Sequence, residues 1–401
     1  MTPDVIGHEG MQVSNYDAAA KELHFSTPEK IRPLPVGISA RMILMKSDCI
    51  YLTRKGANTM AKKMSRLLVE TVVRNALKSI RNDPERGVRN LIDMALQFSE
   101  GRFQKNFFAI AQSMLQNEKS AYYDLVRNTV LHTDIERLYT FGMNLGYNGC
   151  TEGARQIRRY EETMNCNIPW SLSLQTEPGA LEEHREQYDT LIHDGEQLGI
   201  FTWMLFPTCC AQSVLPLVKA HPDSAFCLFC EGSDLTDAFL DEAKDLYHMM
   251  LVVRYDKEIA SRITALQKRE LLYSVWYSYG QRDMEAILNG VLFRNAQELT
   301  PMFTVLLPGE ACPKELRRLV CQAVTRARRE QTYQTILLDL QQDSQTIDSI
   351  ISGDGCSIYF NKDGYLCDWE TSTDREQDNI FQSRLPDILS HACPKEARQL
   401  I

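Results

Sequence analysis

The stretch Ile168-Pro-Trp-Ser-Leu-Ser-Leu-Gln175 is a short apolar run that predicts a buried β-strand. The loop after it reads Thr176-Glu-Pro-Gly-Ala-Leu-Glu-Glu-His184, and no cysteine occurs from Ser171 to Phe206. From Asn167 onward, short apolar runs alternate with amphipathic helical patterns, which is typical of a parallel sheet covered by helices. The sequence therefore predicts an α/β fold, a (β/α) TIM-like barrel that is complete or partial.

Seven such units follow one another, which favours a barrel over an open, flavodoxin-like sheet. A hairpin is expected over residues 357–369, because Asp363-Gly364 is a turn signal between two short apolar runs. The strands are expected at residues 170–175, 201–206, 225–229, 249–254, 271–277, 302–307 and 334–340, with helices at residues 188–198, 213–220, 234–246 and 314–330 between them.

The part of the chain before the first strand has a helical period. Apolar residues from Leu67 to Ile80 recur at spacings of three and four, Asn82-Asp83-Pro84-Glu85 ends one helix and starts the next, and Thr133-Asp134 can cap a later one. We expect an N-terminal arm over residues 1–55, an all-α helical domain over 56–163, the barrel with its C-terminal hairpin over 164–370, and a polar tail over 371–401.

The composition points to a protein outside membranes that does not bind nucleic acid broadly. The 401 residues carry a formal net charge of −9, whereas nucleic-acid binding needs a basic footprint. The sequence starts without a secretion signal and contains no apolar run long enough to span a membrane. We therefore expect a cytoplasmic protein whose 12 cysteines are mostly reduced thiols.

The helical part joined to the barrel part resembles one known family. The resemblance rests on Asn82-Asp83-Pro84-Glu85, Cys166-Asn-Ile-Pro-Trp170, Asp194-Gly-Glu-Gln-Leu-Gly-Ile200, Asp223-Ser-Ala-Phe226, and the Gly355-Cys356 and Asp363-Gly364 region, in that order. Over roughly residues 70–370, this arrangement is similar to the radical S-adenosylmethionine (radical SAM) proteins with an N-terminal helical domain. The resemblance implies a barrel that holds a [4Fe–4S] cluster and S-adenosylmethionine.

The chain departs from that family where the ligands are held. The family's cysteine triplet, CxxxCxxC, has no counterpart after the first strand, although a [4Fe–4S] cluster needs thiolates. The family's Gly-Gly-Glu-Pro motif on strand two corresponds to Pro207-Thr-Cys-Cys210 here. The ends of strands three and four have changed to Cys230-Glu231-Gly232 and Arg254-Tyr-Asp256. We infer a degenerate member that has lost the cluster.

Function in a barrel gathers at the carboxyl ends of the strands. The residues there that could bind a cofactor are Glu177, Thr208, Cys230, Glu231, Arg254 and Asp256. We expect no metal site. An alternative is a relocated metal or cluster site formed by Cys209, Cys210, Cys230 and Cys312, because thiolates select zinc or iron–sulfur clusters.

The remaining cysteines and histidines show no ligand spacing. Cys227 and Cys230 lie three apart on one strand, so their side chains should point to opposite faces. Cys356 and Cys367 flank the hairpin and are expected to be structural, with Cys393 and His391 as possible partners in a zinc site. A turn is expected at the isolated Cys150, and His193 and His221 are expected at the surface.

Together these observations favour a binding or accessory protein, a non-catalytic radical SAM-like pseudoenzyme without a cofactor. Its partner would be another protein or a small molecule in the former cofactor cavity. The alternative is an active radical SAM-type or other metal-dependent enzyme that uses S-adenosylmethionine with an iron–sulfur cluster, or zinc, held by the relocated cysteines.

Overall fold

The computed structural model describes residues 66–97, 99, 101–256, 258–309, 311–352, 356–368 and 375–395. These residues belong to one compact unit that the contacts place within Met64–Ile401. The arm expected over residues 1–55 therefore lies outside the described residues. Within the described ranges, every helix is too short or too polar to cross a lipid bilayer.

Helices precede the sheet, as the period of the sequence predicts. Asp83 precedes α2 and accepts a hydrogen bond from the N–H of Arg86, and Asp134 caps α5 by accepting from Glu136 and Arg137. The segment at Cys150, where a turn was expected, is helical instead. The elements are a helix over residues 66–82, α2 (Pro84–Gln97), α3 (Gly101–Leu115), α4 (Tyr122–His132), α5 (Ile135–Gly142), the π-helix η1 (Met143–Gly153) and α6 (Ala154–Met164).

The sheet has nine strands in the order β7-β6-β5-β4-β3-β2-β1-β8-β9. All neighbours are parallel except β8 and β9, which form the expected hairpin. Strands β7 and β9 are the two edges, so the curled sheet is a partial barrel rather than a closed one. The strands are β1 (Ser171–Thr176), β2 (Thr202–Pro207), β3 (Ala225–Cys230), β4 (Met249–Arg254), β5 (Tyr273–Tyr279), β6 (Phe303–Pro308), β7 (Ile336–Asp339), β8 (Tyr359–Phe360) and β9 (Leu366–Cys367).

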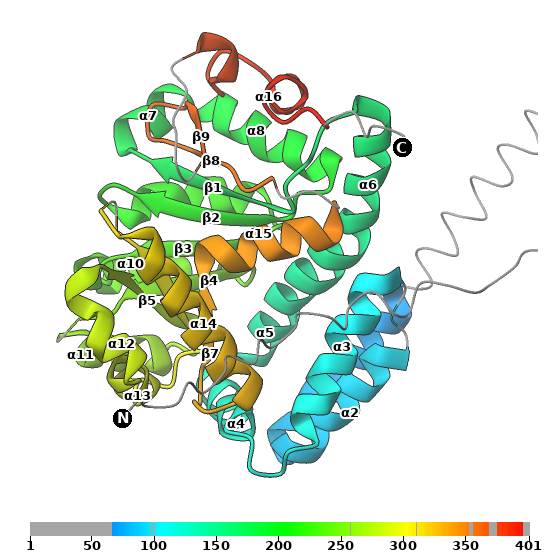
Figure 1. Cartoon of the computed structure of the whole chain (residues 1–401), viewed down its shortest axis with the longest axis vertical. Helices are drawn as coiled ribbons and strands as arrows, with labels where there is room; N and C mark the ends of the chain where they lie inside the picture. Colours follow the sequence, from blue (N-terminus) through cyan, green and yellow to red (C-terminus); the bar gives the residue numbers. More distant parts are fainter. Residues whose placement is uncertain are drawn as a thin grey trace, which may run out of the picture. The chain divides into compact units, whose positions relative to one another are not determined.

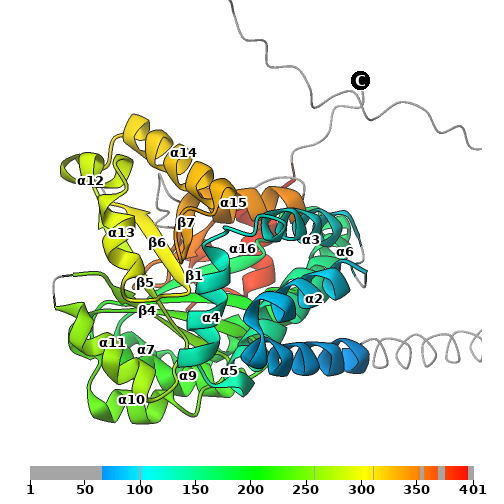
Figure 2. The ribbon, with the colours of Figure 1, turned by 90° about the horizontal axis from the view of Figure 1, so that it is seen from below.

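Helices connect successive strands and return the chain to the same end of the sheet. Figure 2 shows α14 and α15 close to β7, and Figure 1 shows α16 beside α8. The helices are α7 (Pro178–Glu183), α8 (Arg185–Leu198), α9 (Leu215–Ala220), α10 (Asp237–Ala243), α11 (Ile259–Lys268), α12 (Met284–Leu288), α13 (Val291–Gln297), α14 (Lys314–Glu330), α15 (Leu340–Ile351) and α16 (Leu385–Ala392); short 3₁₀ turns are η2 (Ala211–Val214), η3 (Gly232–Asp234), η4 (Gln281–Asp283) and η5 (Glu376–Asp378).

Side chains alternate between two apolar faces of the sheet, as the period of two requires. Trp203 is fully buried on what we call the outer face, in a cluster with residues of α8 to α11. Its neighbour Met204 packs on the inner face, where Phe141 of α5 and Leu340 of α15 cover the sheet. Because both faces are buried, each strand is an apolar run in the sequence rather than an alternating one.

The first helices have a small core of their own. Ile80, Val88, Leu115, Tyr123 and Val130 pack together across the helix over residues 66–82 and α2 to α4. Leu138 of α5 packs against this cluster and also against the inner face of the sheet. Helix α5 thus connects the helical layer to the sheet.

Candidate functional site

The carboxyl ends of β3 and β4 bring together three of the residues expected to bind a cofactor. Glu231 follows β3 and accepts from Arg254, the last residue of β4, with 3.3 Å between Nη1 and Oε1. Asp256 lies beside the turn after β3, since a Cβ built on Gly232 would be 3.9 Å from its Oδ2. Both partners of the ion pair are about half exposed, so the pair contributes little to stability.

Arg254 also lies over an aromatic ring. Its guanidinium carbon is 5.5 Å from the centre of the Trp276 ring, and the Trp276 indole N–H donates to the carbonyl of Cys230 at 3.2 Å. The arginine is therefore held by a carboxylate and an aromatic face from two neighbouring strands. This arrangement can recognise an anionic or planar group at the surface.

The other expected residues lie at the ends of β1 and β2. Glu177 and Thr208 are exposed, and the Thr208 N–H donates to the carbonyl of Thr176 at 2.8 Å, which ties the two loops together. The segment after β1 continues as α7, whose Leu181 is buried in the main core. The place that holds the cluster cysteines in the resembled family is thus occupied by a helix without thiols.

The four cysteines of the alternative metal site are spread over different surroundings. Cys209 and Cys210 are exposed after β2, whereas Cys230 is buried in the outer-face core and Cys312 is buried under α14. Among the described residues, no three His, Cys, Asp or Glu side chains are placed to share a metal ion. The structure does not bring these cysteines together as such a group.

Burial raises the pKa of two of these thiols, those of Cys230 and Cys312. The pKa of Cys230 lies well above its ordinary value because the side chain is buried and because Asp234 and Glu231 are nearby. Burial likewise raises the pKa of Cys312. The prediction for the Cys227 and Cys230 pair is confirmed: Cys227 packs with the inner-face cluster and Cys230 with the outer-face cluster.

The inner face of the sheet is filled with large apolar side chains. The rings of Phe206 and Phe229 stack with their centres 4.2 Å apart, and the Trp276 ring meets Phe229 edge-on at 6.3 Å. Met204 and Met250 complete this layer. These side chains form one apolar layer in front of β2 to β5.

A second polar group, at the ends of β5 and β7, was not predicted as a unit. Tyr279 and Asp339 are each at most 2% exposed, and the Tyr279 hydroxyl and Asp339 Oδ2 have no hydrogen-bond partner among the described residues. Burial raises the pKa of Asp339 to about 6, and Asp343 adds to the effect. Arg317 lies close enough to act on both groups. The sequence alone does not show that Tyr279 and Asp339 lie near each other, because they are 60 positions apart.

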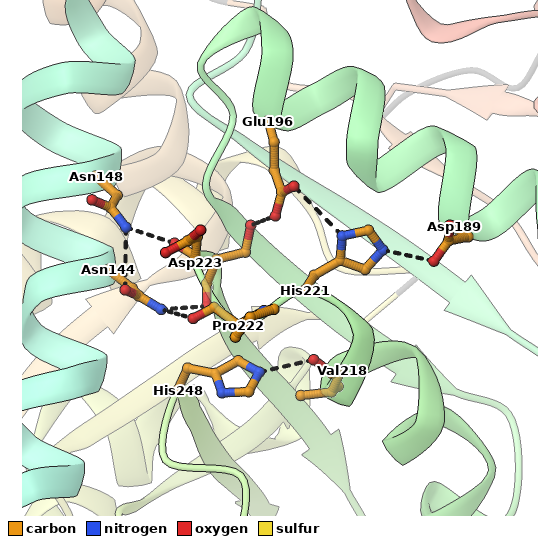
Figure 3. Close-up of polar contacts among 10 residues, drawn as sticks. Asn144, Asn148, Asp189, Glu196, Val218, His221, Pro222, Asp223 and His248 are labelled. Carbon is orange, nitrogen blue, oxygen red and sulfur yellow. Dashed lines mark hydrogen bonds and ion pairs between the residues drawn. The ribbon is translucent and has the colours of Figure 1, made fainter. Parts of the chain in front are cut away.

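His221, expected at the surface, is buried near the amino end of β3, and Figure 3 shows its contacts with Asp189 and Glu196. Its Nε2 is 3.1 Å from Asp189 Oδ1 and its Nδ1 is 3.5 Å from Glu196 Oε2. Asn144 and Asn148 of η1 donate to carbonyls of the loop before β3. This network lies at the amino ends of the strands and joins η1 to the sheet, which indicates a structural role.

The cysteines near the hairpin separate into two places. Cys367 donates to the carbonyl of Tyr365 at 3.6 Å, whereas Cys356 lies next to Cys393. His391 contacts Asp378 and Gln377. The structure therefore does not gather the four residues considered for a zinc site.

A cavity of about 330 Å³ lies away from the sheet, between α2 and α3. It is lined by residues that include Arg89, Asp93, Gln112 and Leu115. The Gln112 amide donates to Asp93 at 2.7 Å across it.

Comparisons with known proteins give structural similarity only. No family model matches the chain, and no curated protein matches its sequence. Three solved structures of SuiB from Streptococcus suis resemble it, each with a TM-score of 0.45 over 61% of this chain. They are SuiB itself (9% identity, 71% of that chain), SuiB bound to S-adenosylmethionine (10%, 69%) and SuiB bound to the precursor peptide SuiA (9%, 70%).

Proposed function

We propose that this chain is a binding or accessory protein on a radical SAM-like partial barrel, and that it has lost the [4Fe–4S] cluster and the cleavage of S-adenosylmethionine. One observation carries the proposal. The segment from Ser171 to Phe206 supplies no thiolate. The residues after β1 form helix α7, whose Leu181 is buried. A [4Fe–4S] cluster is held by cysteine thiolates, so the donor set at this place does not fit the group.

The inner face supports the same proposal. On this face the rings of Phe206 and Phe229 stack and Trp276 packs edge-on against Phe229, so the side chains there are large and apolar. Burial raises the pKa of the Cys230 and Cys312 thiols, which disfavours the thiolate form that binds metals. A partner would then bind at the exposed carboxyl ends of β3 and β4, where Glu231 and Arg254 are accessible.

The remaining parts of the proposal concern organisation. The helices over residues 56–163 form an N-terminal domain that serves as a docking surface, and the protein works in the cytoplasm. The partner is another protein or a small molecule, without nucleic acid. The net charge of −9 supports the last point.

Anaerobic reconstitution tests the loss of the cluster. We expect the full-length chain, incubated with ferrous iron and sulfide and then desalted, to hold iron and sulfide far below one cluster per chain. The matched control is the double variant Cys209→Ser/Cys210→Ser, which should give the same low values. A stoichiometric cluster in the wild type that disappears in this variant would overturn the proposal in favour of the active enzyme.

Fluorescence tests S-adenosylmethionine binding separately. Trp276 lies beside Arg254 at the carboxyl ends of the strands, so a ligand that binds there should change the fluorescence emission of Trp276. We expect no saturable change on titration with S-adenosylmethionine, in the wild type or in Trp276→Phe. A saturable change that Trp276→Phe abolishes would mean that the cofactor site is retained.

A further inference from the structure

The segment around Cys393 and Pro394, late in the chain, lies beside the residues that precede β1. Cys166 forms an isolated antiparallel bridge with Pro394, and the Asn167 N–H donates to the carbonyl of Cys393 at 2.7 Å. The Asn167 carbonyl accepts from the thiol of Cys356, with 3.7 Å between Sγ and O. Asn167 therefore holds Cys393 through its N–H and Cys356 through its carbonyl.

The two thiols meet beside this residue. The sulfurs of Cys356 and Cys393 lie within hydrogen-bonding reach of each other, and the single thiol hydrogen of Cys356 can turn from the Asn167 carbonyl to Cys393 once Cys393 is a thiolate. Cys356 is only 5% exposed, whereas Cys393 is partly accessible to solvent. The accessible member of the pair, Cys393, is thus the one that can meet a reagent from solution.

The hydrogen bond makes the two sulfurs chemically different. It lowers the pKa of the Cys393 thiol against the opposing effect of burial, and it raises the pKa of Cys356 together with burial. A thiolate is the nucleophile in thiol–disulfide exchange. Cys393 is therefore suited to attack first and Cys356 to resolve the intermediate.

We propose that Cys356 and Cys393 form a redox-active pair that is oxidised to a disulfide by a low-molecular-weight disulfide such as oxidised glutathione. The Cys393 thiolate attacks one sulfur of the reagent, forms a mixed disulfide and releases one thiol. Cys356 then loses its proton and attacks Cys393, which forms the protein disulfide and releases the second thiol. Two protein thiols are oxidised, and one disulfide molecule is reduced to two thiols.

The bond would fasten a segment that now depends on non-covalent contacts. Lys395 pairs with Glu161 at 3.1 Å, and Arg384 pairs with Asp194. Between the two cysteines lie the β8–β9 hairpin, which extends the sheet beside β1, and α16. Oxidation closes this whole stretch into a loop, and a longer closed loop constrains the unfolded chain more. The redox state would then control how easily the hairpin detaches from β1 and α16 detaches from α8.

Two other cysteines are competitors that the test must distinguish. The charge of Cys166 acts on Cys356, and that of Cys393 acts on Cys166, so Cys166 is the nearest rival for the pairing. Cys367 belongs to the same hairpin but bonds to the carbonyl of Tyr365. It is therefore the matched control.

Peptide mapping of the full-length wild type tests the proposal. The protein is equilibrated with excess oxidised glutathione, its remaining thiols are alkylated, and it is digested without a reductant. We expect a linked peptide pair that contains Cys356 and Cys393, with the loss of two hydrogens, and its disappearance after reduction. Alkylation of both cysteines in the oxidised sample, or a predominant link between Cys166 and Cys393, would overturn the proposal.

Thermal unfolding provides a second measurement. We expect the oxidised wild type to melt several degrees above the reduced wild type, by roughly 5 °C. Cys356→Ser and Cys393→Ser should show no such difference, while Cys367→Ser should keep it. Comparing oxidised with reduced protein inside each variant removes the cost of the substitution itself. Should a serine variant fail to fold, the peptide map of the wild type still decides.

Discussion

The side chain of Asp348 in α15 accepts a hydrogen bond from the backbone N–H of Trp170, with 2.8 Å between N and Oδ1. Trp170 immediately precedes β1, so this bond fixes the entry into the first strand to a helix 178 residues further on. Asp348 is 1% exposed, and its burial raises its pKa to about 8 although the hydrogen bond opposes the shift. The carboxyl group therefore holds its proton at neutral pH.

This relationship predicts how stability depends on pH. The folded state keeps a proton on Asp348 that the unfolded chain releases near its ordinary pKa of 3.8. The contribution of Asp348 to the free energy of unfolding therefore falls as pH rises from the unfolded to the folded pKa, and it is constant above about 8.

Asp348→Asn keeps the acceptor oxygen and removes the titration. We expect the variant to be more stable than the wild type by roughly 1–3 kcal/mol at about pH 8.5, with a much smaller difference at about pH 5. Urea denaturation at both pH values measures this. A wild-type minus variant difference that does not change with pH would contradict it.

The His221 network should stabilise the protein mainly on the acidic side. Burial lowers the pKa of His221, but Glu196 and Asp189 outweigh burial and raise it above the ordinary value of 6.5. A group with a raised folded pKa contributes its full stability below the unfolded pKa and loses it as pH rises through the folded pKa.

Glu196→Gln should therefore lower the pKa of His221, as seen by NMR titration of its ring protons. The loss of stability should be larger at about pH 5.5 than at about pH 8.5, by about 1 kcal/mol after solvent screening. The Ser224 hydroxyl donates to Glu196 at 2.7 Å and can still do so in the glutamine variant. An unchanged His221 titration would show that Glu196 does not control it.

The contact between α8 and β2 leaves no room for a side chain at Gly195. A Cβ there would lie 2.5 Å from Cζ2 of Trp203, which is fully buried. Gly195→Ala should therefore destabilise the protein by roughly 1–3 kcal/mol, because the core is overpacked. Gly142→Ala is the control, since nothing lies within 4 Å of its Cβ position, and it should stabilise α5 by roughly 0.5–1 kcal/mol. Thermal unfolding of the two variants should shift in opposite directions.

The ion pair between Arg384 and Asp194 fastens the start of α16 to α8. The Arg384 Nε is 2.7 Å from Asp194 Oδ2, and a second nitrogen contacts Oδ1. Arg384→Met leaves the carboxylate of Asp194, which is 5% exposed, without its partner. Limited proteolysis should cleave the segment around α16 several-fold faster in this variant. Lys362→Met removes an exposed pair with Asp363 and should leave the cleavage rate unchanged.

Local patterns in the sequence are sufficient to predict the strands and to show that the segment after β1 has no cysteines for a cluster. Every strand of β1 to β7 begins and ends within two residues of its expected position, because burial on both faces makes each one a short apolar run. The opposite orientation of Cys227 and Cys230 follows from the period of two, which needs no knowledge of the fold. The absence of a thiol after β1 can be seen directly in the amino acids.

Only the tertiary structure decided which distant residues meet. The sheet stays open because β8 pairs with β1 and β7 has no further neighbour in the described sheet, and no local period encodes that pairing. Likewise, Cys393 lies beside Cys356 and not Cys367, and His221 is buried between two carboxylates. Periodicity reports which face of its own element a side chain occupies, whereas these contacts join elements whose separation along the chain carries no such signal.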